Sequence, residues 1–188
     1  MSDRPLLPSI AVVVAAFVIA LILGFTVVVL YADVGTALMT FLRNEVFADV
    51  GDGGPLTLFI KIFLNNLEAC VLLFLGGASL GIVTLIIISL NGMVIGGVVA
   101  LIGGERGPLF MAAALLPHGI FEIPAFLISG ALGLSLGWAL WDEFRGQGDA
   151  AAVGGILGMT FLRVVFPLVL VAAVIEVFIT PYVITLLL

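Results

Sequence analysis

Long runs of apolar residues are the feature that most limits how this chain can fold. The first run, from Ser9 to Tyr31, contains 23 residues without a charged side chain. As an α-helix it would be about 35 Å long at ~1.5 Å per residue, enough to cross the roughly 30 Å hydrocarbon core of a bilayer. Because an isolated helix is the simplest structure that satisfies its own backbone in lipid, we predict an all-α, polytopic transmembrane helix bundle. Further runs of spanning length follow at residues 56–75, 82–102, 120–141 and 162–188.

The composition also indicates an integral membrane protein. Of the 188 residues, 63% are hydrophobic and only 10% are charged, which is far from the balance of a soluble domain. The segments between the runs are too short to form a separate soluble domain of typical size. We therefore expect residues 1–188 to form a single integral membrane domain in the cell membrane, with the lipid bilayer as its first partner.

The charged residues gather in the predicted loops and exclude some kinds of partner. The net charge is −6, and the six basic residues are dispersed along the chain, so no nucleic-acid partner is expected. Cys70 is the only cysteine, which excludes an internal disulfide. Between the first two spans we expect an interfacial helix over residues 36–46 within an acidic segment, 32–55, that contains Asp33, Glu45, Asp49 and Asp52.

The segment from Leu109 to Trp141 is too long to be one straight span. Its 33 residues would give a helix of about 50 Å at ~1.5 Å per residue. Proline lacks an N–H group and disfavours a helix interior, so we expect a backbone break. The break would leave residues 109–116 as a half-length broken or re-entrant helix beside five full spans. The residues predicted to interrupt the backbone are Pro117, Gly119, Pro124 and, in the last span, Pro181.

Ionisable and amide side chains interrupt the apolar spans and form a predicted polar cluster. The only histidine, His118, stands four residues before Glu122, which places both side chains on one face of a helix. Ionisable groups at membrane depth are costly and therefore mark candidate functional sites. The other members of the predicted cluster are Lys61, Asn65 and Glu68, which form one stripe, together with Asn66, Asn91 and Glu176.

Three kinds of function fit this cluster. His118 and Glu122 have the spacing of two metal ligands on a helix, and Glu68 or Glu176 could complete a site for metal-dependent intramembrane hydrolysis. Buried carboxyl groups and an imidazole could instead move a cation, a proton or a small lipid-like solute. The third reading is structural, with the polar groups holding the bundle together.

The sequence favours a non-enzymatic protein, because it holds one histidine and no HExxH motif. We assign no catalytic residue and expect no cofactor. Small residues recur at helix-packing spacing, as in Gly92 and Gly96 or Gly133 and Gly137, which permits close helix contacts and a homodimer.

Four motifs resemble the stage II sporulation protein M family of multi-pass membrane proteins. They are NNLEA at 65–69, SLNGMVIGG at 89–97, PHGIFEIPA at 117–125 and IEVFITP at 175–181. The resemblance implies a membrane protein of a kind widespread in bacteria and archaea, most members having no assigned activity. The namesake acts with cell-wall-degrading partners during engulfment, which suggests a scaffold for another membrane or extracytoplasmic protein. The acidic, lysine-poor loops would suit a salt-adapted archaeon.

Overall fold

The computed structural model describes residues 6–41, 44 and 54–186, and this part of the chain is helical throughout its length apart from short connections. Five helical stretches of the described residues are long and apolar enough to cross a membrane, so the predicted all-α, membrane-type helix bundle is confirmed. The elements in chain order are α1 (Leu6–Leu30), α2 (Ala32–Phe41), α3 (Gly54–Leu75), the 3₁₀ turn η2 (Gly76–Ser79), α4 (Ile82–Arg106), α5 (Pro108–Phe144), α6 (Ala150–Thr160), the π-helical turn η3 (Phe161–Val165), α7 (Phe166–Phe178) and α8 (Thr180–Thr185).

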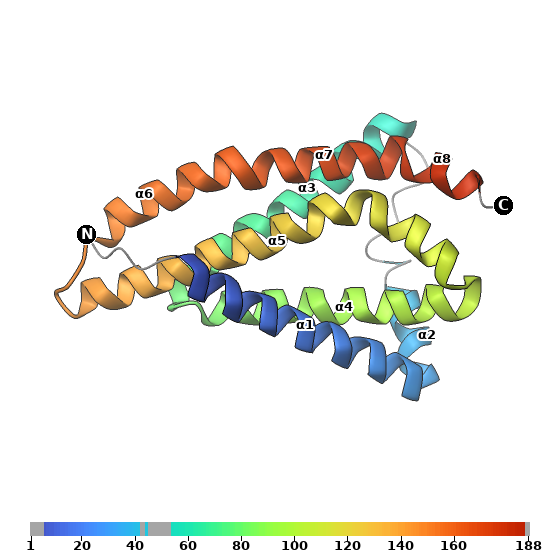
Figure 1. Ribbon diagram of the computed structural model, residues 1–188, viewed down its shortest axis with the longest axis horizontal. Coiled ribbons are helices and arrows are strands. Elements are labelled where there is room, and N and C mark those ends of the chain that lie inside the picture. The colour runs from blue at the N-terminus through green and yellow to red at the C-terminus, as the bar shows by residue number, and fades with distance from the viewer. Residues whose placement is uncertain (1–5, 42–43, 45–53, 187–188) are drawn as a thin grey trace.

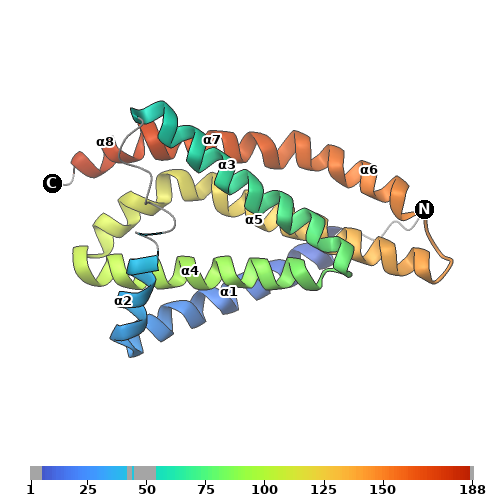
Figure 2. The same cartoon turned by 180° about the vertical axis from the view of Figure 1, so that it is seen from behind.

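Helix α5 forms the centre of the bundle. In the views of Figures 1 and 2 it runs between α1 and α4 on one side and α6 and α7 on the other, with α3 also alongside. Of its most apolar stretch 56% is buried, compared with 28% or less for each of the other four spans. Its inner surface is rich in small residues, which lets neighbouring backbones approach. The buried small residues of α5 are Gly119, Ala125, Ser129, Gly130, Ala131, Gly133, Gly137 and Ala139.

The backbone break expected within residues 109–141 is a bend. Helix α5 contains 37 residues in one helix, with Pro117 and Pro124 inside it. Figure 1 shows the bend in the yellow part of the ribbon, between a shorter first section and a longer second one. Each proline removes one backbone hydrogen bond, but the turns on either side keep theirs, so the helix curves without ending. Residues 109–116 therefore belong to the same helix as the following span and are not a separate half-helix.

Two connections differ from the sequence-based expectation. The expected loop over residues 103–108 shrinks to Gly107, whose positive φ of 86° turns the chain directly from α4 into α5. The polar connection expected over residues 142–152 is also shorter, because α5 continues to Phe144 and Asp149 caps α6 by accepting a hydrogen bond from Ala152 N at 2.9 Å. Residues 150–160 begin the last candidate span, Ala150–Thr185.

Helix α1 packs against α4 through glycine. A Cβ atom on Gly96 would overlap the carbonyl oxygen of Leu21, and one on Gly24 would overlap that of Met93, so the two backbones touch where side chains are absent. This pair of helices forms the most extensive contact in the described part of the chain. Helix α2 ends at Phe41 and covers part of the segment 36–46 where an interfacial helix is expected; Glu45, Asp49 and Asp52 of the predicted acidic loop lie outside the described residues.

Candidate functional site: a buried histidine and glutamate cluster

Three ionisable side chains meet between the bend of α5 and the last third of α7. His118 and Glu122 lie one turn apart on α5, and Glu176 comes from α7, fifty-four residues further along the chain. One nitrogen or oxygen atom from each residue lies within 4.8 Å of the other two. The sequence offered Glu68 or Glu176 as the third member beside His118 and Glu122. The packing of α7 against α5 brings Glu176 to this position.

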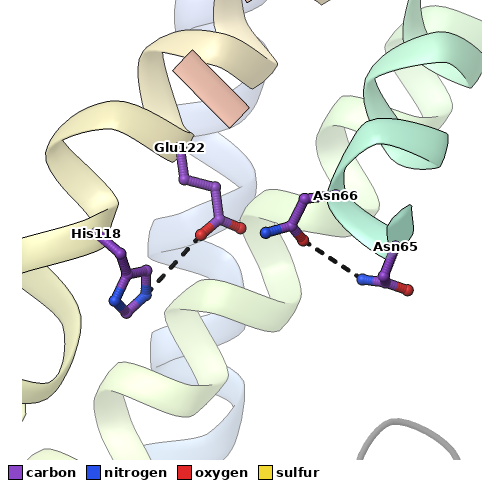
Figure 3. A network of polar contacts seen from close by, with 4 residues as sticks. All are labelled: Asn65, Asn66, His118 and Glu122. Atoms are coloured by element: carbon purple, nitrogen blue, oxygen red, sulfur yellow. Dashed lines mark hydrogen bonds and ion pairs between the residues drawn. The ribbon is translucent and has the colours of Figure 1, made fainter. Parts of the chain in front are cut away.

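The contact between His118 and Glu122 is close without being a hydrogen bond. His118 Nε2 and Glu122 Oε2 are 3.9 Å apart, and their side chains are 12% and 18% exposed. Direct N–H···O bonds are about 2.7–3.2 Å long. Figure 3 shows the imidazole and the carboxyl group facing each other along one side of the helix. The space between them is therefore wider than a hydrogen bond and narrower than a water-filled gap.

Two buried polar atoms near this cluster lack a hydrogen-bond partner among the described residues. They are Nδ1 of His118 and Oγ1 of Thr180. Thr180 is 6% exposed and lies one turn beyond Glu176, at the start of α8, which packs against α5. Sequence reasoning missed Thr180. The signal that could have found it is its spacing of four residues from Glu176, next to Pro181.

The prolines leave backbone carbonyl groups without a donor beside the same cluster. Pro124 cannot donate to the carbonyl of Ile120, and Pro181 cannot donate to that of Val177. Pro181 coincides with a break in the structure, because α7 ends at Phe178 and α8 starts at Thr180. The cluster thus combines an imidazole and two carboxyl groups from two helices, close in sequence to prolines that each remove a backbone donor.

Helix α3 brings a buried amide to the other side of Glu122. Asn66 is 7% exposed, and its Oδ1 accepts a hydrogen bond of 3.4 Å from Asn65 Nδ2. Figure 3 shows the Asn66 side chain directed towards Glu122 from α3. Of the two neighbouring asparagines, Asn66 faces the bundle and Asn65 is exposed.

The remaining residues of the predicted cluster lie elsewhere. Glu68 is exposed on α3, and it is not one of the three residues that meet. Asn91 donates a 2.9 Å hydrogen bond to the carbonyl of Ile87 in its own helix. Lys61 is half-buried on α3. The predicted stripe of Lys61, Asn65 and Glu68 therefore exists as a helix face but does not join His118, because α3 turns Asn66 inward instead.

Hydroxyl groups link α5 to α1 and α3, and they also link α4 to α3. The sequence pattern did not predict these links. Ser129 Oγ donates to the carbonyl of Cys70 in α3, and Thr84 Oγ1 donates to the carbonyl of Leu73 at 2.9 Å. Ser135 Oγ donates to Ser9 Oγ at 2.8 Å. Single hydroxyl groups in apolar runs carry no spacing signal, so only the packing shows which helices they connect.

Comparison with known proteins identifies the family. The sequence profile of the family described as stage II sporulation protein M matches residues 11–181, which takes in at least part of each of the five candidate spans and the residues of the cluster. The chain belongs to the stage II sporulation protein M family. An uncharacterized protein of Methanocaldococcus jannaschii is 34% identical over 135 residues, or 69% of this chain and 75% of its own length.

A second relative covers less of the chain. It is another uncharacterized protein of Methanocaldococcus jannaschii, 34% identical over 79 residues, which are 42% of this chain and 33% of that protein. No solved structure matches the chain. Both relatives are described as uncharacterized proteins, so they bring no activity to this chain.

Proposed function

We propose that this protein is a non-enzymatic subunit in the cell membrane that holds a second membrane protein through the outer face of α3. The observation that carries the proposal is the exposure of Asn65 and Glu68 near the middle of this span. Leu64 and Leu72, one turn to either side of Glu68, are also exposed, so apolar side chains flank the two polar residues, and the half-buried Lys61 lies one turn before Asn65. The face is called the α3 outer face below.

A carboxyl group on such a face is costly unless another protein covers it. An acidic side chain at the centre of a membrane helix costs roughly 3 kcal/mol in lipid. A partner helix that offers a hydrogen-bond donor removes this cost, and interhelical amide and carboxyl contacts contribute about 0.6–2 kcal/mol each. The α3 outer face therefore has the chemistry of a helix-docking surface.

The partner favoured by the charges is a different protein. A symmetric pair of this chain would place the same face of α3 against itself, with one Glu68 close to the other, and like charges repel. A helix with an amide or basic side chain meets both Asn65 and Glu68 without this conflict. A second copy of the chain remains the competing occupant in the experiment below.

The buried cluster supports the same proposal from the inside. His118, Glu122 and Glu176 lie where α5 bends and α7 ends, so they fix the positions of the helices that support α3. The contact between α3 and α7 includes Phe63 and Phe166, whose rings meet edge to face at 5.6 Å. A rigid support of this kind is what a scaffold needs.

The test is recovery of a complex from membranes of the source organism in mild detergent. We expect the parent chain to elute with one stoichiometric partner, and Glu68→Leu to elute alone with unchanged or raised thermal stability. The matched control is Thr26→Leu, which replaces an exposed polar residue on α1 whose hydroxyl bonds only to Ile22 O of its own helix. A complex that survives Glu68→Leu, or a complex made only of this chain, would overturn the proposal.

Cation or proton movement through the cluster is the second candidate, and the meeting of His118, Glu122 and Glu176 within 4.8 Å favours it. In liposomes with an internal pH- or cation-sensitive dye, a transporter would show flux that Glu122→Gln abolishes. If the protein is only a scaffold, liposomes with the parent chain and liposomes with Glu122→Gln should both show the same flux as protein-free liposomes. A cavity of about 690 Å³ lies elsewhere, lined mainly by residues of α1, α2 and α4, and none of the three cluster residues lines it.

A further inference from the structure

Nitrogen and oxygen atoms of the kind that bind metal ions come together from α5 and α7 at the bend of α5. This arrangement suits a role beyond packing the two helices together. We propose that His118, Glu122 and Glu176 bind one divalent transition-metal ion, for which Zn²⁺ is the probe. The inference goes beyond the proposed scaffold role, because a partner could dock on α3 whether or not the cluster holds a metal.

The separations fit metal ligands better than they fit direct pairing. A tetrahedral zinc ion bound at about 2.0–2.1 Å keeps its ligand atoms roughly 3.3 Å apart. The 3.9 Å between His118 Nε2 and Glu122 Oε2 exceeds a hydrogen bond but needs only a small side-chain rotation to reach that value. Glu176 offers its oxygen within 4.8 Å of both.

The helix arrangement is one that metal sites use. Two ligands four residues apart lie on one helix face, and a third ligand comes from a separate element. Here the pair is on α5 and the third ligand is on α7. The bend at Pro117 and Pro124 sets the direction of the first pair, and the end of α7 at Phe178 sets that of Glu176.

The unpartnered atoms are a second and independent observation. Thr180 Oγ1 is buried without a hydrogen-bond partner among the described residues, and Thr180 stands four residues after Glu176 at the start of α8, which packs against α5. An unmade hydrogen bond of a buried group is destabilising, so such a group indicates an ion or a water molecule that completes the site. A hydroxyl group in this position can bond to a metal-bound carboxylate or water, as outer partners of metal ligands do.

Charge and ligand type select the class of metal. Two carboxylates neutralise a divalent ion, so the occupied site is neutral, which suits its burial inside a membrane span. One imidazole and two carboxylates suit Zn²⁺, Mn²⁺ or Fe²⁺. Calcium takes six to eight oxygen ligands, and the three residues that meet supply too few.

The first experiment measures zinc in the full chain. The protein is purified in mild detergent with an affinity tag free of histidine, stripped with a chelator, dialysed against Zn²⁺ and measured by mass spectrometry. We expect about one zinc per chain, and an affinity at least tenfold weaker in each of His118→Gln, Glu122→Gln and Glu176→Gln. Glu143→Gln is the matched control, because Glu143 is an exposed carboxylate on the same helix as Glu122, and it should bind zinc like the parent.

The second experiment needs no variant. Because His118 is the only histidine, ¹⁵N-histidine labelling reports on one imidazole ring. We expect Zn²⁺ to shift one ring nitrogen strongly and the other weakly, and this pattern decides the matter even where a variant fails to fold.

The proposal is overturned if the parent binds no zinc, if zinc leaves both ring nitrogens unshifted, or if a folded Glu176→Gln protein keeps the affinity of the parent. Failure here leaves the docking role of Glu68 intact, whereas a complex that survives Glu68→Leu in a protein with normal zinc binding defeats the docking role alone.

Discussion

Two helix contacts in this protein are built in opposite ways. Between α1 and α4 the backbones touch at Gly24 and Gly96, and the contact depends on the absence of side chains. Between α5 and α7 the contact contains His118, Glu122 and Glu176, and it depends on the chemistry of side chains. The first contact can be changed only by changing the sequence, whereas the proposed metal site would make the second contact depend on a bound ion. The following predictions test this difference, from the largest expected effect to the smallest.

The largest effect is expected at Gly96. In Gly96→Val the new Cβ would overlap the carbonyl oxygen of Leu21, and backbone cannot move aside as a side chain can. We expect the free energy of unfolding to fall by about 3 kcal/mol or more, which would be seen as loss of the monodisperse peak in detergent chromatography. The control is Gly103→Ala on the same helix, where a Cβ meets nothing within 4 Å, and it should be neutral or stabilising by up to about 1 kcal/mol. A folded, stable Gly96→Val protein would show that α1 and α4 are not in close contact.

Metal removal should affect only the second contact. If the cluster holds Zn²⁺, a chelator should speed amide hydrogen exchange in residues 117–124 and 174–182 by roughly tenfold or more, and leave α1 and α4 unchanged. Exchange is followed by mass spectrometry of peptides, with and without added Zn²⁺. An equal increase in exchange rate in all helices would mean that the ion stabilises the whole bundle. No increase in any helix would mean that the contact between α5 and α7 does not depend on an ion.

Ser129→Ala should have an intermediate effect. It removes the hydroxyl group that donates to the carbonyl of Cys70 between α5 and α3, and buried neutral hydrogen bonds contribute about 0.5–1.5 kcal/mol. We expect the melting temperature in detergent to fall by a few degrees. Ser89→Ala is the control, because Ser89 on α4 is half-buried and bonds to no other described residue by its hydroxyl group; a fall as large as that of Ser129→Ala would argue against a specific α3–α5 link.

The smallest expected effect is at Thr180, where the sign of the change in stability depends on whether Zn²⁺ is bound. Thr180→Val removes a buried hydroxyl group that has no hydrogen-bond partner among the described residues. In the metal-free protein we expect stability to stay the same or rise by up to about 1 kcal/mol, because an unsatisfied polar group is lost. With Zn²⁺ bound we expect the opposite sign, since the outer partner of a ligand is lost. Thermal melts with chelator and with Zn²⁺ measure both values, and the same sign in both would exclude Thr180 from the site.

The sequence predicts the helical architecture well because lipid allows few alternatives. The run from Ser9 to Tyr31 matches α1, Leu6–Leu30, and the run at 56–75 matches α3, Gly54–Leu75. Apolar length alone fixes such spans. The same reasoning cannot decide between a break and a bend at Pro117, because a proline removes one hydrogen bond in either case and the neighbouring helices determine which occurs.

The candidate site was predictable in part. The spacing of His118 and Glu122 places them on one face of any helix, and the structure has them there. The position of Glu176 beside them depends on how α7 packs on α5, and the exposure of Glu68 depends on which face α3 turns outward; neither follows from spacing within a single helix. The roles of Thr180 and Ser129 depend on contacts across helices in the same way.

The single-residue connection at Gly107 has a consequence for biosynthesis. Helices α4 and α5 are separated by one residue, so the chain has no loop between them that could stay in water while α5 is synthesised. The two helices must enter the bilayer as one hairpin, and the 37 residues of α5, with their histidine and glutamate, arrive already paired with the apolar surface of α4. An epitope or reporter inserted at Gly107 should therefore block assembly, while the polar turn at residues 145–149 should accept one, which makes the latter the place to map the sidedness of this protein in the membrane.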